Sequence, residues 1–217
     1  MQKRPASVRK MVLMAMLAAL SYMIVAYIQI PVVLFLKYEP KDVIITIGGF
    51  LMGPMASFLI SLVVSLVEMV TVSDTGPIGA LMNLISTCSF ACTAALIYKK
   101  RHDIQGAVLG LLAGGATMIA VMLLWNWLIT PLYMGVSREV VQGMLIPYFL
   151  PFNLFKATLN CALVLILYKP LVTALRRASL VEAAPDRTGG IKWGIGLLSA
   201  GLLALCILFL LLAQHKM

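Results

Sequence analysis

Charged residues are scarce in this sequence. Lys, Arg, Asp and Glu make up only 12% of its 217 residues, whereas 62% are hydrophobic. A soluble domain of this length could not bury so much apolar surface, so a soluble fold is excluded. The apolar residues form long unbroken runs, whereas a membrane β-barrel would show short alternating segments. The composition therefore predicts an all-α fold, a polytopic membrane helical bundle.

The motifs of several enzyme classes are also absent. The sequence contains no GxxxxGK[ST] phosphate-binding loop, no HExxH and no GxSxG, and its two histidines, His102 and His215, are isolated. No two carboxylates are paired within the apolar runs. We therefore expect that the chain is not an enzyme and holds no metal or cofactor. The four cysteines all lie in apolar runs, and we interpret them as small packing residues: Cys88, Cys92, Cys161 and Cys206.

The apolar runs predict six helices in one membrane domain, residues 1–176. Residues 177–217 are expected to form a polar linker and a seventh, C-terminal transmembrane helix. Two polar stretches, residues 37–42 and 131–139, are expected to be loops. The predicted helices cover about Val8–Ile28, Val43–Met52, Met55–Val72, Ile78–Tyr98, Ile104–Ile129, Pro147–Leu175 and Trp193–Ala213.

Basic residues are concentrated in alternate loops. One side of the membrane would hold the N-terminal basic residues, the run Lys99–Arg101 and the basic residues from Lys169 to Lys192, whereas the other side would hold only Lys37, Lys41, Arg138 and Lys216. Cytoplasmic loops carry such an excess, so we expect a cytoplasmic N-terminus and an extracellular C-terminus. This distribution accounts for the net charge of +9, and nucleic acid is not an expected partner.

A few polar side chains interrupt the apolar runs at a common depth. Asn153 and Lys156 are three residues apart and share a helical face. A Lys in the centre of a membrane helix costs roughly 3 kcal/mol, so such a residue usually faces a cavity or a partner. With the orientation above, Asn126 and Glu68 lie near the same outer surface. The inner half has few comparable groups, so a continuous ion pathway is not indicated. We expect a pocket open to the outside.

Simpler interpretations exist for each of these residues. Lys156 could extend its ammonium group to the lipid headgroups, and Asn126 could join two helices. Glu68 is close to the end of its helix and could be exposed at the interface. Tyr38 and Tyr133 could belong to an interfacial aromatic belt.

Small residues recur every four positions on two predicted helices. Gly106, Gly110 and Gly114 are interpreted as packing positions inside the bundle. Ala15 and Ala19 show the same spacing on the first helix. They could pack internally or face an external protein partner.

Three segments of the sequence resemble a known family. They are LKYEPKDVIITIGGFLMGPMAS (Leu36–Ser57), the NW…PLY segment (Asn126–Tyr133) and PFNLFKATLN (Pro151–Asn160). Together with the six-helix core, they resemble the riboflavin-specific substrate-binding (S) component of energy-coupling factor (ECF) transporters. The resemblance covers about Val8–Leu175. The seventh apolar run is a departure from the family.

The resemblance implies a function for the pocket. An S component of this family binds one vitamin in its outer half, beneath the first external loop, in the plasma membrane of a prokaryote. It assembles with a transmembrane coupling (T) subunit and two ATPase (A) subunits. Ala15 and Ala19 match the helix surface that contacts the coupling subunit. The expected riboflavin-binding residues are Asn126, Asn153, Lys156, Tyr38, Glu68 and Tyr133.

Other functions remain open at this point. The same architecture could carry another vitamin, such as thiamine or biotin, or the phosphorylated flavin FMN. A structural membrane subunit would bind no small molecule, and its polar residues would only join helices.

Overall fold

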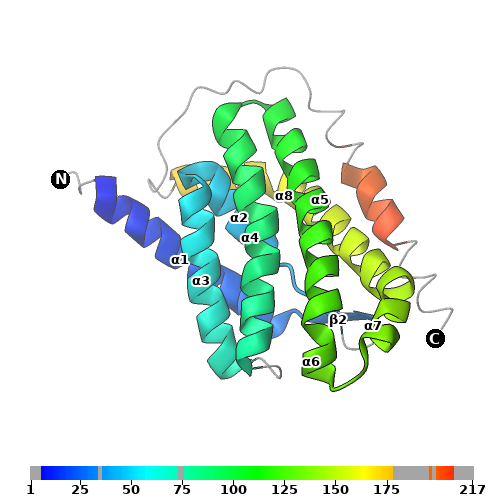
Figure 1. Ribbon diagram of the computed structural model, residues 1–217. Coiled ribbons are helices and arrows are strands. Elements are labelled where there is room, and N and C mark those ends of the chain that lie inside the picture. Colours follow the sequence, from blue (N-terminus) through cyan, green and yellow to red (C-terminus); the bar gives the residue numbers. More distant parts are fainter. Residues whose placement is uncertain (1–5, 34–35, 73–75, 178–195, 197–198, 208–217) are drawn as a thin grey trace.

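The protein is a bundle of packed helices with one small β-hairpin (Figure 1). The computed structural model describes residues 6–33, 36–72, 76–177, 196 and 199–207. Its elements are α1 (Ala6–Tyr27), β1 (Ile30–Val33), β2 (Leu36–Tyr38), α2 (Lys41–Met52), α3 (Pro54–Thr71), α4 (Gly76–Lys100), α5 (Ile104–Leu128), α6 (Thr130–Met134), α7 (Arg138–Met144), the π-helix η1 (Leu145–Phe149) and α8 (Leu150–Arg177).

Several helices can cross a membrane. Within the described residues, five stretches are long and apolar enough: α1, α3, α4, α5 and the continuous stretch from α7 through η1 into α8. They correspond to five of the predicted spanning helices. α2 has only 12 residues, fewer than the ~20 that a span requires. Most of the predicted seventh helix, Trp193–Ala213, lies outside the described residues, although residues 199–207 are helical.

α2 lies inside the bundle and not at its surface. Every residue from Lys41 to Phe50 is buried, and the helix contacts α1, α3, α4 and α8. The short second helix predicted from Val43 is confirmed, but it begins two residues earlier. The prediction of an external loop at residues 37–42 is therefore wrong for Lys41 and Asp42. An acidic residue in a first helical turn is favoured by the helix dipole, which accounts for the position of Asp42.

The connections at one end of the bundle contain more regular structure than expected. β1 and β2 form an antiparallel hairpin in which Ile30 pairs with Tyr38. The predicted loop at 131–139 instead contains α6 and the start of α7. Pro131 is in the first turn of α6, where a missing N–H costs little, and Gly135 ends that helix with φ 65°.

The glycines of α5 allow close contact with α4, and the two helices run side by side in Figure 1. A Cβ atom on Gly110 would lie 2.7 Å from the carbonyl oxygen of Ala94. A Cβ atom on Gly114 would lie 2.5 Å from the carbonyl oxygen of Phe90. The interpretation as packing positions inside the bundle is confirmed for Gly110 and Gly114, whereas Gly106 packs against Arg101 in the turn between α4 and α5.

This contact gives a test of the fold. Gly114→Ala should lower the free energy of unfolding by about 1–3 kcal/mol, because the added methyl group forces α4 and α5 apart. Thermal unfolding in detergent measures the change. Gly143→Ala is the matched control, because a Cβ atom there meets nothing within 4 Å. Equal melting temperatures for the two variants would contradict close packing at Gly114.

Candidate functional site

A cavity of about 330 Å³ lies at the end of the bundle that carries the hairpin. Its walls come from the hairpin region, the end of α3, the start of α4, the end of α5, α6 and the first turns of α8. These segments meet because neighbouring helices run in opposite directions. The turn between α4 and α5 lies at the opposite end of the bundle (Figure 1).

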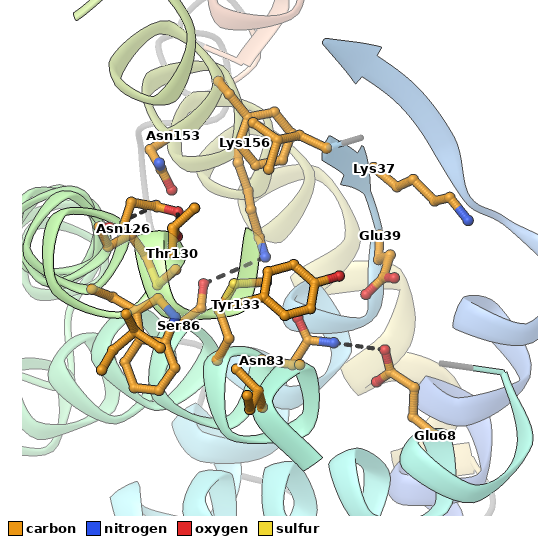
Figure 2. A pocket seen from close by; sticks show the side chains of 18 of the residues that line it. Lys37, Glu39, Glu68, Asn83, Ser86, Asn126, Thr130, Tyr133, Asn153 and Lys156 are labelled. Carbon is orange, nitrogen blue, oxygen red and sulfur yellow. Dashed lines mark hydrogen bonds between the residues drawn. The ribbon is translucent and has the colours of Figure 1, made fainter. Parts of the chain in front are cut away.

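Five of the six predicted binding residues line this cavity: Asn126, Asn153, Lys156, Glu68 and Tyr133 (Figure 2). The two amides are held by their own helices. The side-chain nitrogen of Asn126 donates to the carbonyl of Met122 at 2.7 Å, and that of Asn153 donates to the carbonyl of Phe149 at 2.8 Å. The Asn126 side-chain oxygen also accepts a hydrogen bond from Thr130 at 2.9 Å. These bonds fix both amides at the cavity wall.

Lys156 is buried and paired. Its ammonium group lies 3.1 Å from a carboxylate oxygen of Asp42 and 3.5 Å from the hydroxyl of Ser86. Only 6% of Lys156 is exposed, so it does not extend to the lipid headgroups. The carboxylate of Asp42 also accepts hydrogen bonds from Thr87 at 2.7 Å and from Asn160 at 3.4 Å.

Asp42 is the main residue that the sequence analysis missed. It was assigned to an external loop, but it is fully buried in the first turn of α2. The pattern Pro40-Lys41-Asp42 before an apolar run is typical of a helix start and could have placed it on α2. Nothing in the sequence could have paired it with Lys156.

A second group of charges surrounds Lys41. The Lys41 ammonium group lies 2.7 Å from Glu39 and also contacts Glu68. Asn83 donates to the other carboxylate oxygen of Glu68 at 2.7 Å. Glu68 is therefore buried, and its interpretation as an exposed interfacial residue is wrong. Glu39, in the connection between β2 and α2, and Glu68, on α3, thus contact the same ammonium group.

Tyr38 is not among the residues that line the cavity. Its buried hydroxyl donates to the side-chain oxygen of Asn160 at 2.8 Å, and its ring packs edge-on against Phe155. Burial and the nearby Asp42 carboxylate raise the pKa of the Tyr38 hydroxyl, so it remains a proton donor. Tyr38 thus connects the hairpin to α8, and a direct contact with a ligand stays a prediction.

Two further features bear on possible partners and ligands. Ala15 and Ala19 are exposed on α1, whereas Ala18 between them is buried.

Within the part of the chain that the structure describes, no three His, Cys, Asp or Glu side chains are grouped so that they could hold a metal ion.

Comparisons with known proteins agree on one family. A family model described as "ECF transporter, substrate-specific component" matches residues 9–168. Riboflavin transporter RibU of Staphylococcus aureus (strain TCH60) is 24% identical over 179 residues, covering 78% of this chain and 93% of that protein. Riboflavin transporter FmnP of Bacillus subtilis (strain 168) is 25% identical over 189 residues, covering 80% of this chain and 98% of that protein. A solved S component of a bacterial ECF transporter superposes with a TM-score of 0.67 at 25% identity, covering 79% of this chain and 99% of that one.

The ion pair of Asp42 and Lys156 can be tested directly. Asp42→Asn should lower the free energy of unfolding by about 3–5 kcal/mol, because it leaves the Lys156 ammonium group buried without a counter-charge. The double variant Asp42→Asn, Lys156→Met should recover part of this loss. Glu139→Gln, at an exposed position, is the control. Thermal unfolding of the two single variants and the double variant gives a double-mutant cycle. If the losses in the free energy of unfolding of the single variants add up to the loss in the double variant, the two side chains do not interact.

Proposed function

Because this chain belongs to the family of substrate-specific components of ECF transporters, we propose that it binds riboflavin in the cavity beside the hairpin. The observation that carries the proposal is the gathering of Asn126, Asn153 and Lys156 around one cavity at one end of a membrane bundle. The two similar proteins described above, RibU and FmnP, are both named riboflavin transporters. The chain itself is a binding subunit and not an enzyme.

The chemistry of the cavity suits riboflavin. This vitamin has a flat, largely apolar ring system with polar edges and a polyhydroxyl chain. Small-molecule sites are mostly apolar, with a few placed polar groups, and occupy roughly 300–1,000 Å³. Here Trp125, Met122 and Phe152 supply apolar wall, and the two asparagines offer both donors and acceptors. Aromatic and amide groups together fit a ring that stacks and hydrogen-bonds at its edge.

The charge distribution supports an outward-facing cavity. The exposed basic residues at the end of α4 and towards the end of α8 are Lys99, Lys100, Lys169 and Arg177. The cavity is formed by the opposite ends of these two helices. A cytoplasmic position for the basic end places the cavity and the hairpin outside. This arrangement keeps the N-terminus in the cytoplasm and lets the protein capture riboflavin from the exterior.

Transport then requires partners. The ATP-hydrolysing subunits and the coupling subunit of an ECF module would supply the energy. The exposed small residues Ala15 and Ala19 leave a shallow surface on α1 that a helix of the coupling subunit can approach closely.

Ligand binding provides the first test of this function. Purified protein should bind riboflavin, measured by quenching of flavin fluorescence, and should carry no thiamine or biotin. Asn153→Ala should weaken riboflavin binding by about tenfold, because a bound polar group loses its hydrogen-bond partner. Gln142→Ala removes an exposed amide outside the cavity and is the control. Displacement of riboflavin by thiamine or biotin, or no flavin binding at all, would contradict the proposal.

Coupling to partners provides the second test. Ala15→Trp should abolish riboflavin uptake in cells that contain the ECF module, while the purified variant binds riboflavin as the unmodified protein does. Ala116→Trp, at an exposed position on α5, should support normal uptake. If riboflavin binding fell together with uptake in Ala15→Trp, this face of α1 would serve internal packing and not a partner.

A further inference from the structure

The cavity has two chemically different ends. Figure 2 shows Asn126, Thr130 and Asn153 on one side and Glu39 and Glu68 on the other, with the Lys156 ammonium group between them. Trp125 and Phe152 are the sequence neighbours of Asn126 and Asn153 and also line the cavity. One end therefore carries neutral amides and a hydroxyl group, and the other end carries the two carboxylates.

This difference sets the orientation of a flavin. The polar edge of the ring system matches the end with Asn126 and Asn153, whose amides offer donors and acceptors, while Trp125 and Phe152 supply apolar wall to the same cavity. The polyhydroxyl chain then extends towards Glu39, Glu68 and Asn83, whose carboxylate and amide oxygens can accept hydrogen bonds from its hydroxyl groups.

The buried cations near the cavity already have carboxylate partners. Lys156 is paired with Asp42 at 3.1 Å, and Lys41 lies between Glu39 and Glu68. Lys41 does not line the cavity, whereas both glutamates do. Among the described residues, Lys37 is the other cation that lines the cavity; it is exposed, and its ammonium group donates to the side chain of Gln29 at 3.2 Å. Glu39 and Glu68 share the single charge of Lys41, so these three groups keep one net negative charge beside the exposed ammonium group of Lys37.

We propose that Glu39 and Glu68 make this site selective for a flavin whose chain ends in an uncharged hydroxyl, and that they reject a terminal phosphate. This inference rests on the proposed riboflavin function. A phosphate monoester carries roughly −1.5 to −2 charge at neutral pH. Bringing it to two carboxylates in a partly dehydrated cavity places like charges together, which opposes binding. Free riboflavin lacks this charge, and its hydroxyl groups can donate to the same carboxylates.

The experiment compares two ligands that differ only in the phosphate. Affinities for riboflavin and for FMN are measured by fluorescence quenching on purified protein freed of bound flavin. The unmodified protein should bind riboflavin at least about tenfold more tightly than FMN. Glu39→Gln should raise the FMN affinity by about tenfold. The ratio of the riboflavin affinity to the FMN affinity should fall, because the glutamine oxygen still accepts a hydrogen bond from a hydroxyl group of the chain but carries no charge. Glu39 is the position of choice because Lys41 keeps Glu68 as its partner.

Three controls separate charge from other causes. Glu39→Asp keeps the charge and should keep the preference for riboflavin. Glu139→Gln removes an exposed carboxylate that does not line the cavity and should change neither affinity. A riboflavin ester with an uncharged acyl group at the phosphorylated hydroxyl tests size, and it should bind better than FMN.

Each result has a definite meaning. Three outcomes would overturn the inference while leaving riboflavin binding in place. In Glu39→Gln, the ratio of the FMN affinity to the riboflavin affinity could stay unchanged, or both affinities could fall by the same factor. In the unmodified protein, the uncharged ester could bind as weakly as FMN. A protein that binds neither flavin would instead contradict the proposed function. Glu68→Gln gives a second, independent measurement and should also raise the FMN affinity relative to the riboflavin affinity.

Discussion

The buried ion pair between Asp42 and Lys156 is the interaction on which the candidate site depends. Removing two charges from water costs several kcal/mol per ion, and only close contact with further hydrogen bonds offsets this cost. Thr87 and Asn160 supply those bonds to Asp42. The pair joins α2 to α8, and so the charged residues at the start of α2 are held inside the bundle.

The other polar contacts extend from this pair. Asn160 also accepts the hydrogen bond of Tyr38, which ties the hairpin to α8. The residue next to Asp42, Lys41, connects Glu39 before α2 with Glu68 on α3. The cavity wall is therefore held by a connected set of charges and amides, and most of its cations are already neutralised. That neutralisation is the reason the site suits an uncharged ligand.

The sequence predicted much of the fold and part of the site. Long apolar runs identified the spanning helices, because crossing a bilayer requires about 20 consecutive apolar residues. Asn126, Asn153 and Lys156 were identified because polar side chains are costly among apolar neighbours. The short helices α6 and α7 and the hairpin were missed, because short segments at the membrane surface show no strong apolar periodicity. Asp42 was missed because the charged residues around Pro40 were assigned together to a loop, and its ion pair with Lys156 depends on a contact between distant segments that the sequence does not show.

The amino-acid sequence by itself determined that this chain is a helical membrane protein with a few polar groups at one depth. That result follows from local composition, since the bilayer excludes unpaired polar backbone and isolated charge. Tertiary structure alone decided which of those groups share a cavity and which neutralise one another. Asp42 and Lys156, like Lys41 and Glu68, are far apart in the chain, and only the packing of α2 between α1, α3, α4 and α8 brings these opposite charges into contact.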